Sequence, residues 1–143
     1  MNHPQTTAVQ FSKIKHLDAI AKYGCCAMVT LWCLGIEPDN DIETIKILDE
    51  AIESGALDKD CIVKWDPFLT FVTGKHFDVE FKNISSIKSI TKRTPVRYDY
   101  NGCSHWVGVE NGQIKYNSLV NSVCVAKGKP VTARIILLNG KQI

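Results

Sequence analysis

The chain has 143 residues and a mass of 16.0 kDa, and 45% of its residues are apolar and 22% charged. This is the size and composition of one globular domain with its own core, so disordered and collagen-like proteins are excluded. No apolar run reaches the roughly 18 residues of a membrane span, and a pI of about 8.2 is too low for a dedicated nucleic-acid-binding protein. We expect a single domain over residues 1–143, with 1–10 as a flexible tail and with neither membrane nor nucleic acid as partner.

The first half of the chain predicts helices. Apolar residues at helical spacing indicate a short first helix, which the Tyr23-Gly24 pair ends. The second has Thr30 as its only polar residue, so it should be buried at the centre of the fold. Side-chain caps, an early proline and terminal glycines bound the last two. The expected helices cover residues 11–22, 25–34, 42–55 and 65–74.

The second half predicts strands, since its apolar and polar residues alternate with a period of two. Asn111-Gly112 stands between two such runs and is a strong signal for a tight hairpin. Helices followed by strands indicate the α+β class, with the helices packed on an antiparallel sheet. The expected strands cover residues 77–81, 95–100, 104–110, 113–117 and 131–138.

Charge is divided between the same two halves. Residues 1–73 carry 6 basic and 11 acidic side chains, a net charge of −5, whereas residues 74–143 carry 11 and 4, a net charge of +7. We expect the halves to attract each other in the folded protein. The basic second half is the one argument for a nucleic-acid-binding function.

The chain has six cysteines, an even number that suggests disulfides. The N-terminus has no signal-peptide pattern, however, so we expect a cytoplasmic protein with six free thiols in a reducing compartment. No CxxC pair is present and the four histidines lack ligand spacing, so neither a metal nor another cofactor is predicted.

Cys25 and Cys26 directly follow a glycine at the start of the buried helix. A thiol there feels the positive end of the helix dipole and unpaired backbone N–H groups, which lower its pKa and favour the nucleophilic thiolate. The alternative is that either cysteine is simply a small core residue. Cys26 also stands as the second choice for the nucleophile.

His105 and Asn117 complete a possible triad. Alternation places His105 on the same strand face as Val107 and Val109, where a histidine is often only a packed core residue. Pairing about the Asn111-Gly112 turn brings Asn117 alongside it. A thiol at a helix start, a strand histidine and a neighbouring asparagine form the Cys-His-Asn arrangement of nucleophilic catalysis.

Three short motifs carry a resemblance. They are YGCCAM at 23–28, SHWVGV at 104–109 and KYNSL at 115–119. In this order and spacing the chain resembles papain-like cysteine peptidases, most closely the bacteriocin-processing type and its small phage- and spirochaete-associated relatives. The resemblance implies a bacterial or phage hydrolase with a papain-like fold, in which helices around a buried central helix pack on an antiparallel sheet and the site lies between them.

The resemblance also implies roles for particular residues. Cys25 would be the nucleophile, His105 the base and Asn117 the residue that orients the base, while the backbone N–H of Cys26 would donate to the oxyanion. Such enzymes carry a glutamine shortly before the cysteine, whose amide completes the oxyanion hole. This chain has none between Phe11 and Gly24.

Together these features predict a thiol protease or amidase that cleaves a peptide or peptidoglycan-type amide bond. The alternative is a catalytically inactive papain-like binding or structural module, which the missing glutamine favours. Neither the substrate's sequence nor the oligomeric state can be read from these patterns.

Overall fold

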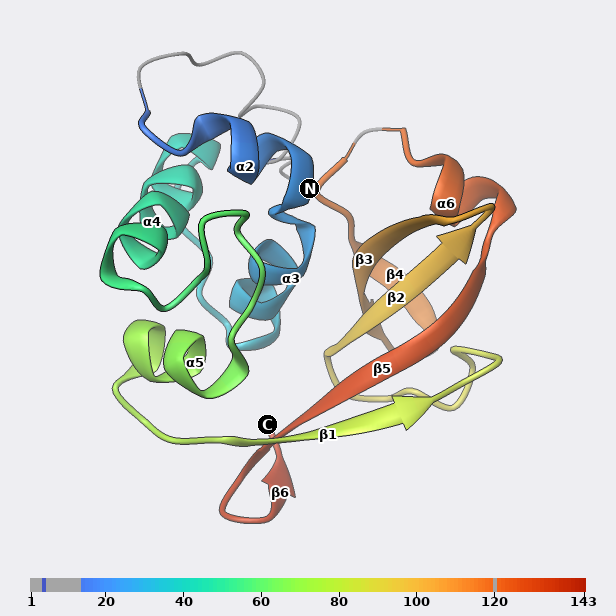
Figure 1. The fold of residues 1–143 in the computed structure, drawn as a ribbon. Coiled ribbons are helices and arrows are strands. Elements are labelled where there is room, and N and C mark those ends of the chain that lie inside the picture. The colour runs from blue at the N-terminus through green and yellow to red at the C-terminus, as the bar shows by residue number, and fades with distance from the viewer. Residues whose placement is uncertain (1–3, 5–13, 120) are drawn as a thin grey trace.

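The computed structural model describes residues 4, 14–119 and 121–143. It is an α+β structure in which a helical first half lies beside an antiparallel sheet formed by the second half, as predicted (Figure 1). Apart from Pro4, the tail predicted over residues 1–10 lies outside the described residues.

The helices follow the sequence signals closely. Asn40 accepts a hydrogen bond from the Glu43 backbone N–H at 3.0 Å to begin one helix, and Gly55 ends it with a φ of 85°. No helix in the described part of the chain is long and apolar enough to cross a lipid bilayer. The predicted start of the first helix, over residues 11–13, lies outside the description, and a turn precedes Leu17. The helices are α2 (Leu17–Tyr23), α3 (Cys25–Cys33), α4 (Asp41–Ser54) and α5 (Trp65–Thr73).

All five predicted strands are present, and every pair among them is antiparallel. Asn111 and Gly112 form the predicted hairpin turn with φ angles of 52° and 72°. The strands are β1 (Asp78–Asn83), β2 (Thr94–Tyr100), β3 (Cys103–Glu110), β4 (Gln113–Tyr116), β5 (Lys129–Leu138) and β6 (Lys141–Gln142).

The spatial order of the strands is β1-β5-β2-β3-β4, with β6 paired to β5. The last long strand therefore inserts between β1 and β2, which follow each other in the chain. The sequence patterns did not predict this insertion, nor the short helix α6 (Val123–Lys127), which Ser122 caps by accepting from the Val125 N–H at 3.4 Å.

The sheet is covered on both faces. Helix α3 lies between the other helices and the sheet and packs on β3 and β2 (Figure 1). Its burial confirms the prediction of a central apolar helix, because eight of its nine residues are buried. On the other face Val107 and Val109 pack with Cys124 of α6 and with Ile84 and Ile87 of the loop before β2.

Arg93 joins the two halves. Its Nη1 donates to the backbone oxygen of Trp32 at 2.9 Å and to Glu37 Oε1 at 3.0 Å, and its guanidinium lies 4.4 Å from the Trp32 ring centroid. A cation at the C-terminal end of α3 is favoured by the helix dipole. This contact between a basic residue of the second half and an acidic residue of the first is the kind of attraction that the charge distribution predicted.

Candidate active site

Cys25 is the first residue of α3. Gly24, with φ −75° and ψ −4°, is the only residue between α2 and α3, and its N–H donates to Ile20 O at 3.0 Å. A Cβ atom at position 24 would lie 2.5 Å from that same oxygen, so a side chain does not fit there. The tight junction directs the backbone N–H groups of Cys25 and Cys26 toward the Cys25 sulfur.

The expected lowering of the Cys25 pKa is wrong for this structure. The residue is 9% exposed, and burial raises the pKa of its thiol above 9.0. Hydrogen bonding from the backbone N–H groups of Trp106, Cys26 and Cys25 lowers the pKa but does not offset the burial. The physical reason is that the free-energy cost of removing a thiolate from water is larger than the stabilisation that the helix N-terminus gives it. At neutral pH the resting side chain is therefore a thiol.

His105 and Asn117 lie together, as the hairpin predicted. His105 Nε2 is 2.7 Å from Asn117 Oδ1, and the backbone N–H of Leu119 donates to the same oxygen at 3.1 Å. An atom that accepts from a backbone N–H is the amide oxygen, so Nε2 of His105 must be the donor. The proton of the neutral ring is thus on Nε2, and Nδ1 carries the free lone pair.

Burial also keeps His105 neutral. Its side chain is 3% exposed, and burial lowers its pKa below 6.5, while the hydrogen bond to Asn117 acts in the opposite direction. A buried neutral imidazole with one fixed tautomer is a proton acceptor at Nδ1 near neutral pH. The arrangement therefore supplies a base rather than a standing imidazolium.

Cys25 approaches β3 next to this histidine. The backbone N–H that stabilises its sulfur from outside α3 belongs to Trp106, the residue after His105. Within the described residues no hydrogen bond joins the Cys25 sulfur to His105 itself. Catalytic contacts of this kind are often loose without substrate and tighten when it binds.

The two neighbouring cysteines face different surroundings. Burial raises the pKa of the Cys26 thiol and the nearby Cys25 raises it further, whereas Arg134 lowers it. Cys26 is thus close to Arg134 of β5, while Cys25 is at the Trp106 backbone. The backbone N–H of Cys26, in the first turn of α3, remains the candidate donor to the oxyanion. Gln10, the nearest glutamine before Cys25, lies outside the described residues.

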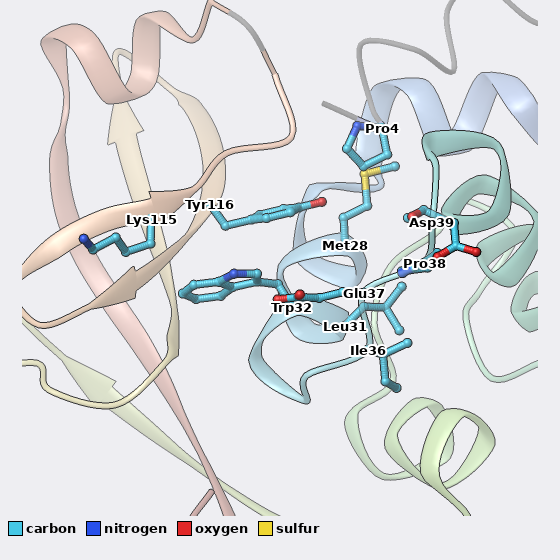
Figure 2. A pocket seen from close by; sticks show the side chains of 11 residues that line it. Pro4, Met28, Leu31, Trp32, Ile36, Glu37, Pro38, Asp39, Lys115 and Tyr116 are labelled. Atoms are coloured by element: carbon cyan, nitrogen blue, oxygen red, sulfur yellow. The ribbon is translucent and has the colours of Figure 1, made fainter. Parts of the chain in front are cut away.

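A cavity of about 550 Å³ lies along α3 and β4 (Figure 2). Its lining includes Met28, one helical turn after Cys25, and Tyr116, which precedes Asn117, but none of Cys25, His105 and Asn117. The rings of Trp32 and Tyr116 stack along it with centroids 5.9 Å apart, and Pro4 lies at its edge above Met28. The cavity wall combines these apolar and aromatic side chains with the charged residues Glu37, Asp39 and Lys115.

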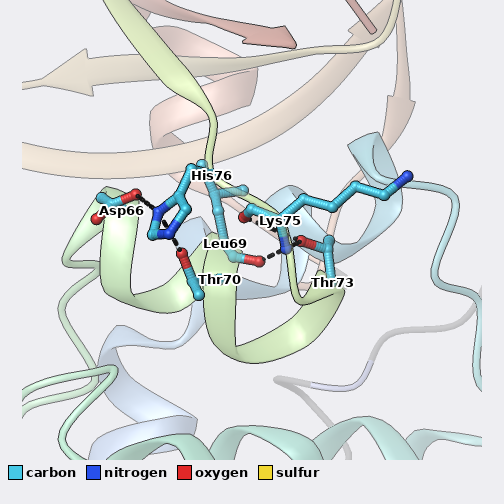
Figure 3. Close-up of polar contacts among 6 residues, drawn as sticks. All are labelled: Asp66, Leu69, Thr70, Thr73, Lys75 and His76. Carbon is cyan, nitrogen blue, oxygen red and sulfur yellow. Dashed lines mark hydrogen bonds and ion pairs between the residues drawn. The ribbon is translucent and has the colours of Figure 1, made fainter.

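A second cluster with a triad-like composition has a different geometry. His76 Nδ1 is 3.1 Å from Asp66 Oδ1 and 3.4 Å from Thr70 Oγ1 (Figure 3). The aspartate and the threonine therefore share one ring nitrogen, so the ring cannot pass a proton from one to the other. Asp66 and His76 are exposed, and the two contacts tie α5 to the segment that leads into β1.

The part of the chain that the structure describes contains no group of three His, Cys, Asp or Glu residues placed to hold a metal ion. All six cysteines are free thiols. Trp65 and Trp106 make an edge-to-face contact with centroids 6.4 Å apart, which joins α5 to β3 near Cys26. Arg134 is a site neighbour that sequence reasoning missed, because its proximity depends on the insertion of β5.

Comparison of the chain with protein-family models, with curated proteins and with solved structures found no match in any of the three. The resemblance to papain-like peptidases therefore rests on the three short sequence motifs.

Proposed function

We propose that this protein is a papain-like cysteine hydrolase that cleaves an amide bond of a peptide or of a peptidoglycan-type cross-link. The observation that supports it most is the fixed tautomer of His105. Asn117 Oδ1 accepts from Nε2 at 2.7 Å and from the Leu119 N–H, which leaves Nδ1 as the acceptor at the strand that meets the start of α3. A packed core histidine does not require this double restraint.

Acylation begins from a neutral pair, since burial raises the pKa of Cys25 and lowers that of His105. As the sulfur attacks the carbonyl carbon, its proton passes to Nδ1 of His105, and the carbonyl oxygen becomes an oxyanion. The N–H groups of Cys25 and Cys26 at the start of α3 are the donors available to that oxyanion. Asn117 keeps the imidazolium in place while it exists.

Deacylation returns the enzyme to its first state. The C–N bond breaks, and His105 gives its proton to the leaving nitrogen, so an amine departs and an acyl thioester remains on Cys25. A water molecule then loses a proton to His105 and attacks the thioester. The C–S bond breaks, the carboxylic acid leaves, and the sulfur regains a proton from His105.

The proposal is tested by the alkylation rate of each cysteine with iodoacetamide between pH 4 and 9, followed by peptide mapping. Rates for the wild type are compared with His105→Ala and Asn117→Ala, and His76→Ala serves as the control at an exposed histidine. We expect His105→Ala to slow labelling of Cys25 near neutral pH, and Asn117→Ala to do so more weakly because it removes orientation rather than the base.

A Cys25 rate that His105→Ala leaves unchanged, with a lower melting temperature as its only effect, would contradict the proposal. That result would favour the alternative, a papain-like binding or structural module in which His105 only packs. Preferential labelling of Cys26 would move the nucleophile by one residue.

A further inference from the structure

Arg134 lies on the face of the sheet that α3 covers. Residues 132, 134 and 136 of β5 share a face because side chains alternate along a strand. Ile136 packs with Val29 and Trp32 of α3, which identifies that face. Arg134 is paired across the strands with Phe81 of β1.

Two aromatic rings hold the Arg134 side chain in position. Its Cζ atom is 4.3 Å from the Phe81 ring centroid and 5.3 Å from that of Trp106. Stacking of a guanidinium on aromatic faces is favourable and restricts its orientation. Trp106 contacts both groups: its ring lies against the Arg134 guanidinium, and its backbone N–H contacts the sulfur of Cys25, the proposed nucleophile.

No carboxylate neutralises this guanidinium within the described residues. Its Nη1 atom is buried and has no hydrogen-bond partner there, and neither does Thr132 Oγ1 on the same face. The other two arginines do have partners, since Arg93 pairs with Glu37 and Arg97 with Asp99. A buried donor without a partner is costly, so one in a folded protein calls for an explanation.

The nearby acidic residue is already engaged. Asp99 accepts from Arg97 Nε at 3.1 Å and from Nη2 at 3.2 Å, and Ser104 Oγ donates to it at 2.7 Å. Asp99 is therefore engaged by Arg97, and Glu110, at the other end of β3 on the same face, pairs with Arg93. One positive charge next to Cys26 is left for an incoming group.

We infer that Arg134 is the anchor for a carboxylate of the substrate, so that the amide cleaved at Cys25 belongs to a molecule with a negatively charged group close to the scissile bond. This inference rests on the proposed function, because it takes Cys25 as the point of attack. A guanidinium matches the two oxygens of a carboxylate with parallel hydrogen bonds, and the Arg134 side chain is half-buried rather than enclosed. Acidic peptides and peptidoglycan-type peptides with free carboxylates both fit this chemistry.

The test uses two alkylating reagents of equal length, N-iodoacetylglycine with a carboxylate and N-iodoacetylglycinamide without a charge. Peptide mapping gives the rate of each at Cys25, and the result is the ratio of the anionic to the neutral rate. The ratio cancels any change in the fraction of thiolate, because both reagents attack the same sulfur. It is measured in the wild type, in Arg134→Gln and in Arg134→Lys, with Arg93→Gln as control at the far end of α3.

We expect Arg134→Gln to lower the ratio by about threefold to tenfold, Arg134→Lys to lower it less, and Arg93→Gln to leave it at the wild-type value. Salt at about 0.5 M should reduce the wild-type ratio toward that of Arg134→Gln. If Cys25 reacts with both reagents and the ratio is the same in wild type, Arg134→Gln and Arg134→Lys, the carboxylate anchor is wrong and the proposed function stands. If Cys25 reacts no faster than the other thiols and is insensitive to His105→Ala, the proposed function fails, and the anchor fails with it.

Discussion

The Trp32 indole of α3 occupies the space that a side chain at position 108 of β3 would need. A Cβ atom on Gly108 would lie 2.5 Å from Trp32 Cε3 and 3.0 Å from Tyr116 Cβ. This close approach sets the separation of α3 and β3, and therefore of the elements that carry Cys25 and His105.

Gly108→Ala should accordingly destabilise the protein by about 1–3 kcal/mol, the usual cost of overpacking a core. Urea unfolding measures the loss, and the labelling rate of Cys25 should fall with it because the strand moves away from the helix. Trp32→Phe replaces the ring that causes the clash with a smaller one. The double variant with Gly108→Ala and Trp32→Phe should therefore lose less unfolding free energy than the sum of the losses in the two single variants. Strict additivity would show that the contact does not limit the packing.

Unfolding at different pH values should reveal the buried neutral His105. Burial lowers its folded-state pKa below 6.5, so the unfolded chain binds the proton more readily than the folded one. The contribution of neutral His105 to the free energy of unfolding is therefore complete above pH 6.5. It is lost as the pH falls from 6.5 through the lower pKa that His105 has in the folded state. His105→Gln should therefore show a shallower loss of stability than the wild type between pH 7.5 and 5.

His76→Gln, in the exposed segment between α5 and β1, is the matched control for that experiment. It measures the effect of replacing a histidine outside the site. The assignment of His105 as a buried neutral base fails if the profiles of the wild type and His105→Gln run parallel.

Thiol accessibility should separate the six cysteines. Cys103 is exposed, whereas burial raises the pKa of Cys61 to about 12 and that of Cys33 further. An uncharged disulfide reagent should modify Cys103 in the native protein, and Cys33 and Cys61 only after unfolding. All six thiols should titrate in denaturant without a reductant. A non-reduced mass lower by multiples of two hydrogens would contradict the free-thiol state.

Helix α4 offers a test that is independent of the site. Asn40→Ala removes the side-chain oxygen that accepts from the Glu43 N–H at 3.0 Å, and should cost about 1 kcal/mol of unfolding free energy. Asn40→Asp keeps an acceptor and should be close to neutral, and Asp39→Ala is the control at the adjacent exposed position. Equal stabilities of Asn40→Ala and Asp39→Ala would show that the cap contributes nothing.

Local signals in the sequence were enough to predict most elements of the fold. Helix caps and turns depend only on residues that are close together in the sequence. Examples are the cap at Asn40, the helix end at Gly55 and the turn at Asn111-Gly112. The same reasoning predicted the contact of His105 with Asn117, because a hairpin brings its two strands together in a register that the turn determines. The apolar composition of residues 25–34 by itself predicts a buried central helix.

Only the tertiary structure decided the features that depend on distant contacts. β5 pairs with both β1 and β2, and no short-range pattern specifies which strands a long terminal strand will join. That choice places Arg134 beside Cys26. The packing around the start of α3 buries Cys25 as well, so the pKa of its thiol rises although a helix N-terminus lowers it. Desolvation depends on everything packed around a group, whereas the helix dipole depends only on the residues next to it.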